Sequence, residues 1–355
     1  MKFAISAVSI LAILTPAWAQ GAGKNIHTDL RNLTGPYAPS RYFTDSSLQR
    51  HTIYQPRTVP SGASFPILVW GEGACAADGT AVQNFLHNIA SYGFVVIANG
   101  NPGGSGTTSA SWLTESLDWV SQKAGSSGYQ HYDKNRIAAA GWSCGGLEAY
   151  EMRSDSRVKS IGIFNSGQFD QSSTNRVVPQ VRVPIFFFLG GPSDIAYNND
   201  SPVLQGERDY DAVSSGIPKW KGNLNVGHGA TYYDQNGGKF GTAAANWLSW
   251  VLKGDSSAAS FFTGNGAQSA GWNVEYANLG NIQGGVLSRP PDLLPRPPGP
   301  PPTQTPAPPP PLVHLPLKAA TLVTVRLAGA NAAVRDTLAQ LAAKVEALAH
   351  SATNG

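Results

Sequence analysis

Short apolar runs recur along the chain between residues 65 and 253, and each is followed by a turn and then by a helical pattern. Apolar runs bounded by Gly, Pro or Asn predict buried strands, whereas apolar positions three and four apart predict amphipathic helices. The strands expected from this pattern are 65–70, 94–98, 136–140, 158–164, 183–189 and 224–226. The expected helices are 82–90, 109–123, 147–152 and 242–253, and the second has Trp112, Leu113, Leu117, Trp119 and Val120 on its predicted inward face.

This alternation of strands and helices predicts an α/β protein with a mostly parallel central sheet and helices on both faces. Ile185 to Leu189 is apolar throughout, as expected of a strand that is buried on both sides. In such sheets ligands bind at the carboxyl ends of the strands, so the residues that follow each run are the candidates for chemistry. The segment between the strands that contain Ile161 and Ile185 is short, and we therefore expect no large lid.

Both ends of the chain differ in composition from this core. Residues 1–19 carry a lysine at position 2, continue as an apolar run and end in Ala17-Trp18-Ala19, which is the pattern of a secretory signal peptide. Residues 290–316 are mostly proline and predict an extended linker. Residues 317–355 are Ala-rich and predict either a loosely ordered tail or a short amphipathic helix with apolar positions at Val334, Leu338, Leu341, Val345 and Leu348. Residues 20–289 are therefore expected to form the folded domain.

The charge of the chain gives no reason to expect a nucleic-acid partner. The formal net charge is only +3, and charged residues are 13% of the chain, about half of the usual share. No stretch after the leader is apolar enough to span a membrane, so we expect a secreted, extracellular protein. Asn32 and Asn199 begin N-glycosylation sequons. We expect a monomer, with association through the tail as the alternative.

The candidate nucleophile is Ser143 in Gly141-Trp142-Ser143-Cys144-Gly145. This pattern follows the predicted strand 136–140 and precedes the predicted helix 147–152, which is the setting of a nucleophile elbow. The tight turn of an elbow projects the serine hydroxyl from the sheet edge and leaves no room for side chains at the flanking glycines. A Gly-rich turn with an ordinary serine is the alternative.

A serine becomes a nucleophile only when a base takes its proton and a third group orients that base. In a sheet of this type the order along the chain is Ser, acid, His. Of the seven histidines only His228 lies between Ser143 and the proline-rich segment, in Gly227-His228-Gly229. We therefore expect His228 to be the base.

The acid should follow the strand between Ser143 and His228. Asp194 ends the turn Gly190-Gly191-Pro192-Ser193 that follows strand 183–189, and it is the favoured candidate. The competing carboxylates lie in the polar segment that comes later, at Asp200, Glu207, Asp209 and Asp211.

Acyl transfer also requires backbone N–H groups that stabilise an oxyanion. We expect one from Cys144, directly after the nucleophile, and the other from the turn after strand 65–70, at Glu72 with Gly73 as the alternative. The two cysteines of the chain, Cys75 and Cys144, lie one in each of these segments. In a secreted chain an even number of cysteines suggests a disulfide, so we expect a Cys75–Cys144 bridge, with two unpaired buried thiols as the alternative.

Three segments resemble secreted α/β-hydrolases related to dienelactone hydrolases, chlorophyllase-like proteins and polyester-hydrolysing cutinases. They are Val69-Trp70-Gly71-Glu72-Gly73, Gly141-Trp142-Ser143-Cys144-Gly145-Gly146 and Gly227-His228-Gly229, and the likeness covers about residues 50–255. The resemblance implies the α/β-hydrolase fold and a serine esterase that needs neither cofactor nor metal. Dienelactone hydrolases use a cysteine nucleophile where this chain has Ser143, so their specific activity is not implied.

The sequence thus predicts a hydrolase that cleaves small-molecule or polymeric carboxylic esters through an acyl-enzyme on Ser143, with residues 20–289 as its catalytic domain. A peptidase or amidase with the same triad is one alternative. The other is a non-catalytic wall or carbohydrate-binding protein that retains the fold.

Overall fold

In the computed structural model, which describes residue 30 and residues 32–197 and 205–282, the described strands form one sheet in the order β1-β2-β4-β3-β5-β6-β7-β8-β9. The six neighbouring strands from β4 to β8 in this order are parallel. At one edge of the sheet β2 pairs antiparallel with β4 and β1 with β2, and at the other edge β9 pairs antiparallel with β8. The strands are β1 (Ser40–Asp45), β2 (Leu48–Pro56), β3 (Phe65–Gly71), β4 (Val95–Asn99), β5 (Tyr132–Trp142), β6 (Val158–Phe164), β7 (Ile185–Leu189), β8 (Lys219–Asn223) and β9 (Asn273–Ala277).

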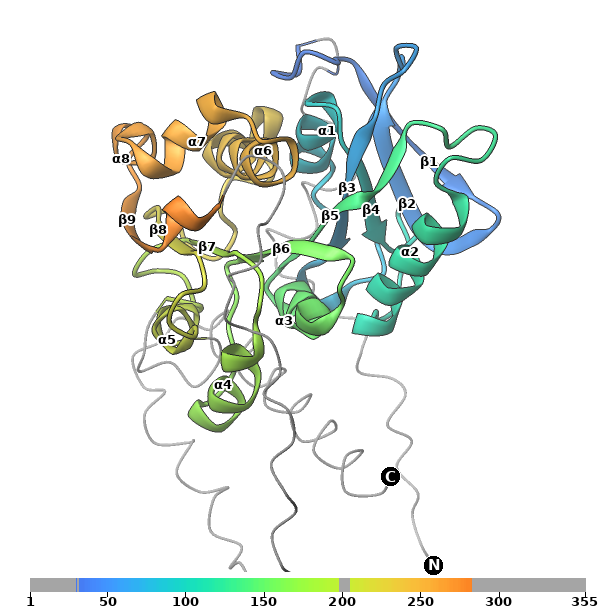
Figure 1. Cartoon of the computed structure of the whole chain (residues 1–355). Coiled ribbons are helices and arrows are strands. Elements are labelled where there is room, and N and C mark those ends of the chain that lie inside the picture. The colour runs from blue at the N-terminus through green and yellow to red at the C-terminus, as the bar shows by residue number, and fades with distance from the viewer. Residues whose placement is uncertain (1–29, 31, 198–204, 283–355) are drawn as a thin grey trace, which may run out of the picture. The chain divides into compact units, whose positions relative to one another are not determined.

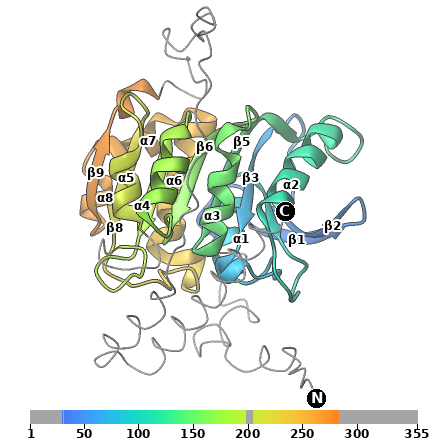
Figure 2. The same ribbon diagram turned by 90° about the horizontal axis from the view of Figure 1, so that it is seen from below.

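Helices cover both faces of this sheet (Figures 1 and 2). Helices α1 and α6 pack together on one face, and α2 packs against α3 on the other, where α4 and α5 also lie. The helices are α1 (Gln83–Ser91), α2 (Ala110–Lys123), α3 (Cys144–Glu151), α4 (Gln171–Val177), α5 (Gly206–Ala212), α6 (Gly238–Lys253), α7 (Ser256–Thr263) and α8 (Gly266–Ser269). Short 3-10 turns are η1 (Gly73–Cys75), η2 (Met152–Ser154), η3 (Val178–Gln180), η4 (Gln235–Gly237) and η5 (Leu279–Asn281). The predicted α/β class with a mostly parallel sheet is confirmed.

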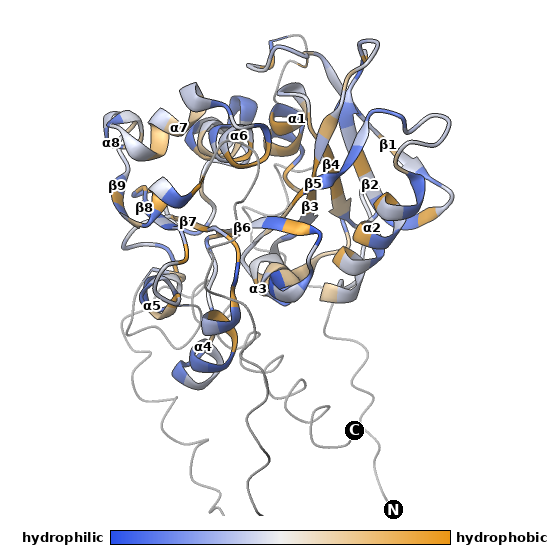
Figure 3. Cartoon of the chain, in the orientation of Figure 1, coloured by the Kyte–Doolittle hydropathy of each residue, from blue (hydrophilic) through white to orange (hydrophobic). Residues whose placement is uncertain are grey.

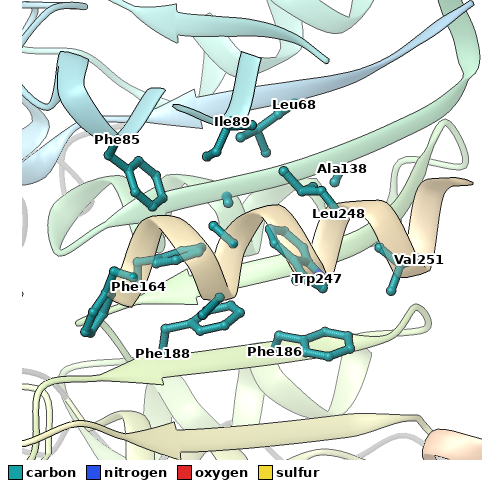
Figure 4. Close-up of a cluster of buried hydrophobic side chains, with 14 of the residues drawn as sticks. Leu68, Phe85, Ile89, Ala138, Phe164, Phe186, Phe188, Trp247, Leu248 and Val251 are labelled. Atoms are coloured by element: carbon teal, nitrogen blue, oxygen red, sulfur yellow. The ribbon is translucent and has the colours of Figure 1, made fainter. Parts of the chain in front are cut away.

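The core lies between the sheet and the α1/α6 layer. Because side chains alternate along a strand, Phe186 and Phe188 of β7 point to the same face. There they meet Trp247 of α6, with ring centroids 5.9 and 6.0 Å apart (Figure 4). Burial of each large apolar side chain contributes about 1.5–3 kcal/mol. The apolar residues concentrate in the central strands and in the helix faces toward them, whereas the loops are more hydrophilic (Figure 3).

The predicted elements up to strand 183–189 match β3 to β7 and α1 to α3, with small differences at their ends. The prediction of a strand at 224–226 was wrong, because the strand is β8 and ends at Asn223. The apolar pattern does not reveal β8, because this strand contains the charged Lys221. Its side chain can be buried because it pairs with Glu207 and Glu275. The closing helix begins at Gly238, four residues before the predicted start at Thr242.

The inward face predicted for α2 is confirmed for Leu113, Leu117, Trp119 and Val120, which are buried. The prediction was wrong for Trp112, which is only half-buried. The Arg50 guanidinium lies 4.4 Å from the centre of the Trp112 ring, so the indole covers a surface cation instead of entering the core.

Several elements were not predicted from the pattern, namely β1, β2, β9, α4, α5, α7 and α8. The edge strands β1 and β9 carry mostly exposed or half-exposed side chains, so they lack a long apolar run. The connection from β6 to β7, residues 165–184, contains α4 and η3. The predicted leader 1–19, linker 290–316 and tail 317–355 lie outside the described residues, as do Asn199 and Asp200.

Candidate active site

Ser143 occupies a sharp turn between β5 and α3 at the carboxyl edge of the sheet. Its backbone has φ +55° and ψ −117°, a conformation that a residue with a Cβ rarely adopts. Neighbouring groups hold this strained turn: the Ser143 N–H donates to the carbonyl of Phe164 (2.9 Å), and Ser166 Oγ donates to the carbonyl of Ser143 (2.6 Å). These hydrogen bonds hold the strained backbone of Ser143 in place, and strained residues held by their surroundings are common at active sites.

The turn packs directly on the backbone at the end of β3. A Cβ placed on Gly145 would lie 2.0 Å from the carbonyl oxygen of Gly71, so only glycine allows the two segments to approach this closely. This contact brings the loop after β3 against the first turn of α3. The two segments expected to carry oxyanion donors are thus neighbours.

His228 lies in the turn after β8, and its ring reaches the serine. Its Nε2 is 2.9 Å from Ser143 Oγ, and its Nδ1 is 2.7 Å from Asp194 Oδ1. A carboxylate only accepts hydrogen bonds, so Nδ1 carries the proton and Nε2 is the acceptor for the serine hydroxyl. The Trp142 indole N–H donates to the His228 carbonyl oxygen at 3.0 Å and fixes the backbone of this turn.

Asp194 lies in the turn after β7 and is only 2% exposed. Burial alone would raise the pKa of this carboxyl, but hydrogen bonds from His228 and from the N–H groups of Ala196 and Gly190 lower it below the usual value of 3.8. The carboxylate therefore stays ionised and can stabilise a positive imidazolium.

The competing carboxylates that the structure describes are engaged elsewhere. Glu207 pairs with Lys221, and Asp209 accepts from Tyr150 Oη (2.8 Å) and from the N–H of Gln168 (2.6 Å). Asp211 is exposed on α5. Of the candidate acids described, Asp194 is the one in contact with His228.

The predicted bridge between Cys75 and Cys144 is confirmed, with a Cα–Cα distance of 5.1 Å. Cys144 is the first residue of α3, where backbone N–H groups have no intrahelical partner. Cys75 ends η1, in which Ala74 and Cys75 both have positive φ. The bridge therefore ties the loop after β3 covalently to the helix N-terminus beside Ser143.

Two buried carboxyl groups lie near this loop. Glu72 is fully buried, and burial raises the pKa of its carboxyl well above the usual range, so the protonated form is favoured. Burial likewise raises the pKa of Glu148 to about 7, although Thr108 and Asn99 donate hydrogen bonds to it. The protonated form of Glu72 places no negative charge beside the N–H groups of its own loop.

One residue in contact with the candidate triad was missed by the sequence analysis. Asn165 follows β6, and its Nδ2 donates to Asp194 Oδ2 at 2.7 Å. The sequence does contain a signal for Asn165, because this polar residue follows an apolar run directly. Asp194 follows its own apolar run after a short turn. An amide has no place of its own in the order Ser, acid, His, so this order does not single out Asn165.

Within the described ranges there is no group of three or more His, Cys, Asp or Glu side chains that could hold a metal ion. No described helix combines the length and the apolar character that a membrane span requires. No family model matches this chain, and no curated protein matches it.

Proposed function

We propose that this protein is a secreted serine hydrolase that cleaves carboxylic esters through an acyl-enzyme on Ser143. The observation that carries the proposal is the continuous hydrogen-bonded series Ser143–His228–Asp194, with distances of 2.9 and 2.7 Å. Its support comes from three separate loops, after β5, β7 and β8, that meet at one edge of the sheet. Such a meeting is expected of an active site in an α/β sheet.

The acylation step uses each member of this series once. As Ser143 Oγ attacks the ester carbonyl carbon, His228 Nε2 takes the hydroxyl proton, and Asp194 stabilises the imidazolium. The oxyanion accepts hydrogen bonds from the Cys144 N–H and from the loop after β3, where Glu72 and Gly73 are the two candidate donors. His228 then returns the proton to the leaving alcohol as the carbon–oxygen bond breaks.

Deacylation runs through the same groups with water in place of the serine. His228 Nε2 takes a proton from the water as its oxygen attacks the acyl carbon, and the released Ser143 Oγ recovers a proton from the imidazolium. The products are the free acid and the original enzyme.

The fold supports this proposal. We infer an α/β-hydrolase fold because the nucleophile follows a strand and precedes a helix, the oxyanion loop joins β3 to α1, and the order along the chain is Ser, Asp, His. The disulfide is compatible with an oxidising, extracellular location, which the predicted leader also favours.

A fluorophosphonate probe tests whether Ser143 is a nucleophile. We expect the wild type and the control Ser260→Ala, which changes an exposed serine of α7, to be labelled, and Ser143→Ala to remain unlabelled. Unlabelled wild type would remove the proposal and favour a non-catalytic binding protein, whereas equal labelling of Ser143→Ala would place the reactive nucleophile at another residue.

Hydrolysis of p-nitrophenyl esters, compared with peptide anilides, tests the bond that is cleaved. Faster hydrolysis of the esters is expected, whereas faster cleavage of the anilides would make the protein a peptidase or amidase. Asp194→Asn should lower kcat by a factor on the order of 10³–10⁴, and the exposed Asp211→Asn should not.

A further inference from the structure

Asn165 joins the candidate acid to two other parts of the site. It is the first residue after β6, the strand that lies between β5, which leads to Ser143, and β7, which leads to Asp194. Its Nδ2 donates to Asp194 Oδ2 at 2.7 Å and, at 3.4 Å, to the carbonyl of Gly227, next to His228. Its Oδ1 accepts from the hydroxyl of Tyr232 at 2.6 Å.

The orientation of the Asn165 amide follows from its partners. The Asp194 carboxylate and the Gly227 carbonyl only accept hydrogen bonds, so the NH₂ group must face them and Oδ1 must face Tyr232. Burial raises the pKa of the Tyr232 hydroxyl well above its usual range, which keeps this group protonated as a donor. The amide therefore has one stable position, with its donor directed at the acid.

Asn165 adopts a backbone conformation in which glycine would be less strained. Its φ is +45°, in the left-handed region, where asparagine is tolerated but glycine is less strained. Asn165 is fully buried, and its N–H donates to the Phe188 carbonyl at 2.8 Å. A glycine would relieve the backbone but could not donate to Asp194.

We propose that Asn165 is a positioning residue that holds the Asp194 carboxylate in the orientation that directs Oδ1 at His228. The inference rests on the proposed function, since it assigns a role within that triad. Asp194 Oδ1 accepts from His228 and from the Ala196 N–H, while Oδ2 accepts from Asn165 and the Gly190 N–H. Apart from His228, Asn165 is the only side chain of the described residues that donates to this carboxylate. Its loss leaves Oδ2 with the Gly190 N–H as its remaining donor, so the carboxylate is held less firmly.

Two variants test this role. Asn165→Gly keeps the backbone conformation and removes the donor, so kcat on a p-nitrophenyl ester should fall about ten- to one-hundred-fold with KM little changed. Asn165→Asp keeps the size of the side chain but can donate only while its new carboxyl is protonated. The ratio of kcat/KM in Asn165→Asp to that in the wild type should therefore fall as the pH rises from 5 to 9.

A merely structural role would lower activity by the same factor at every pH. Asn278 gives the matched control, because it is exposed and also has positive φ, +58°. Asn278→Gly and Asn278→Asp should retain wild-type kcat and a flat ratio. A folded Asn165→Gly with wild-type kcat, or a flat ratio for Asn165→Asp, would overturn the inference.

A third variant keeps the test decisive if both Asn165 variants fail to fold. Tyr232→Phe removes only the hydroxyl that holds Oδ1, and we expect a smaller loss of kcat without a change in KM; unchanged kcat would then overturn the inference. Fluorophosphonate labelling of the wild type separates the two proposals. If the wild type is labelled and active and the variants keep its kcat, only the role of Asn165 is rejected. If the wild type is not labelled, the proposed function is rejected as well.

Discussion

Removal of the Cys75–Cys144 bridge is the perturbation whose size follows most directly from the structure. The bridge closes a loop with a sequence separation of 69 residues. The restriction that such a loop places on the unfolded chain is worth about 4 kcal/mol at 25 °C. Cys75→Ala/Cys144→Ala should lose about this much free energy of unfolding, because its unfolded chain is no longer restricted.

Urea denaturation followed by far-ultraviolet circular dichroism measures this loss. With an m-value of about 2–3 kcal/mol/M, the midpoint should fall by roughly 1.3–2 M. Wild-type protein in dithiothreitol should unfold at the midpoint of the double variant, and dithiothreitol should not affect the double variant itself. Equal midpoints for the wild type and the double variant, both measured without reductant, would show that the bridge adds no stability.

The position of the bridge also predicts an effect on catalysis. Because it ties the loop after β3 to the N-terminus of α3, its loss should increase the freedom of both proposed oxyanion donors. We expect kcat for ester hydrolysis to fall more than KM rises, since the oxyanion forms only in the transition state. A variant that is less stable but has the wild-type kcat would show that the bridge stabilises the chain without positioning the donors.

Three other predictions concern stability and modification. Gly145→Ala should destabilise the protein by at least about 3 kcal/mol, because the new Cβ would lie 2.0 Å from the Gly71 carbonyl oxygen. Gly280→Ala is the control, because its Cβ would meet no atom within 4 Å, and equal melting temperatures of the two variants would contradict the prediction. Burial raises the pKa of Glu148 from 4.5 to about 7, so the folded state holds a proton that the unfolded state releases, and stability should fall by at most about 3 kcal/mol as the pH rises through this window. In urea titrations at pH 5 and 8, Glu148→Gln should lose less stability between the two pH values than the wild type. An equal loss in the wild type and the variant would exclude Glu148 as the cause. Asn32 is exposed, and Asn32→Gln from a eukaryotic secretory host should lose the mass of one glycan in mass spectrometry. A mass that changes only by the substitution itself would show that the sequon is unused.

Much of the candidate site could be predicted from local patterns. Ser143 was found because an elbow needs glycines beside a serine between a strand and a helix, and those requirements lie within a few residues of one another. His228 followed from the order of the groups along the chain. The disulfide could be predicted because the chain has only two cysteines, which leaves one pairing.

Other features depend on residues far apart in the sequence. Local pattern favoured Asp194 but left the later carboxylates as competitors, because the choice depends on which carboxyl group faces His228. The strand β8 was misplaced because the charge of Lys221 is compensated by Glu207 and Glu275, which come from other elements.

Apolar periodicity, a short motif and the scarcity of a residue type are enough to predict the α/β class, the candidate nucleophile and base, and the bridge. How the candidate acid is held follows only from the arrangement of the strands in space. Asn165 contacts Asp194 only because β6 lies between β5 and β7 in the sheet, and no spacing along the chain expresses that neighbourhood. Hydrogen bonds act over about 3 Å in space, so partners that are distant in sequence become visible only when the strands are placed side by side.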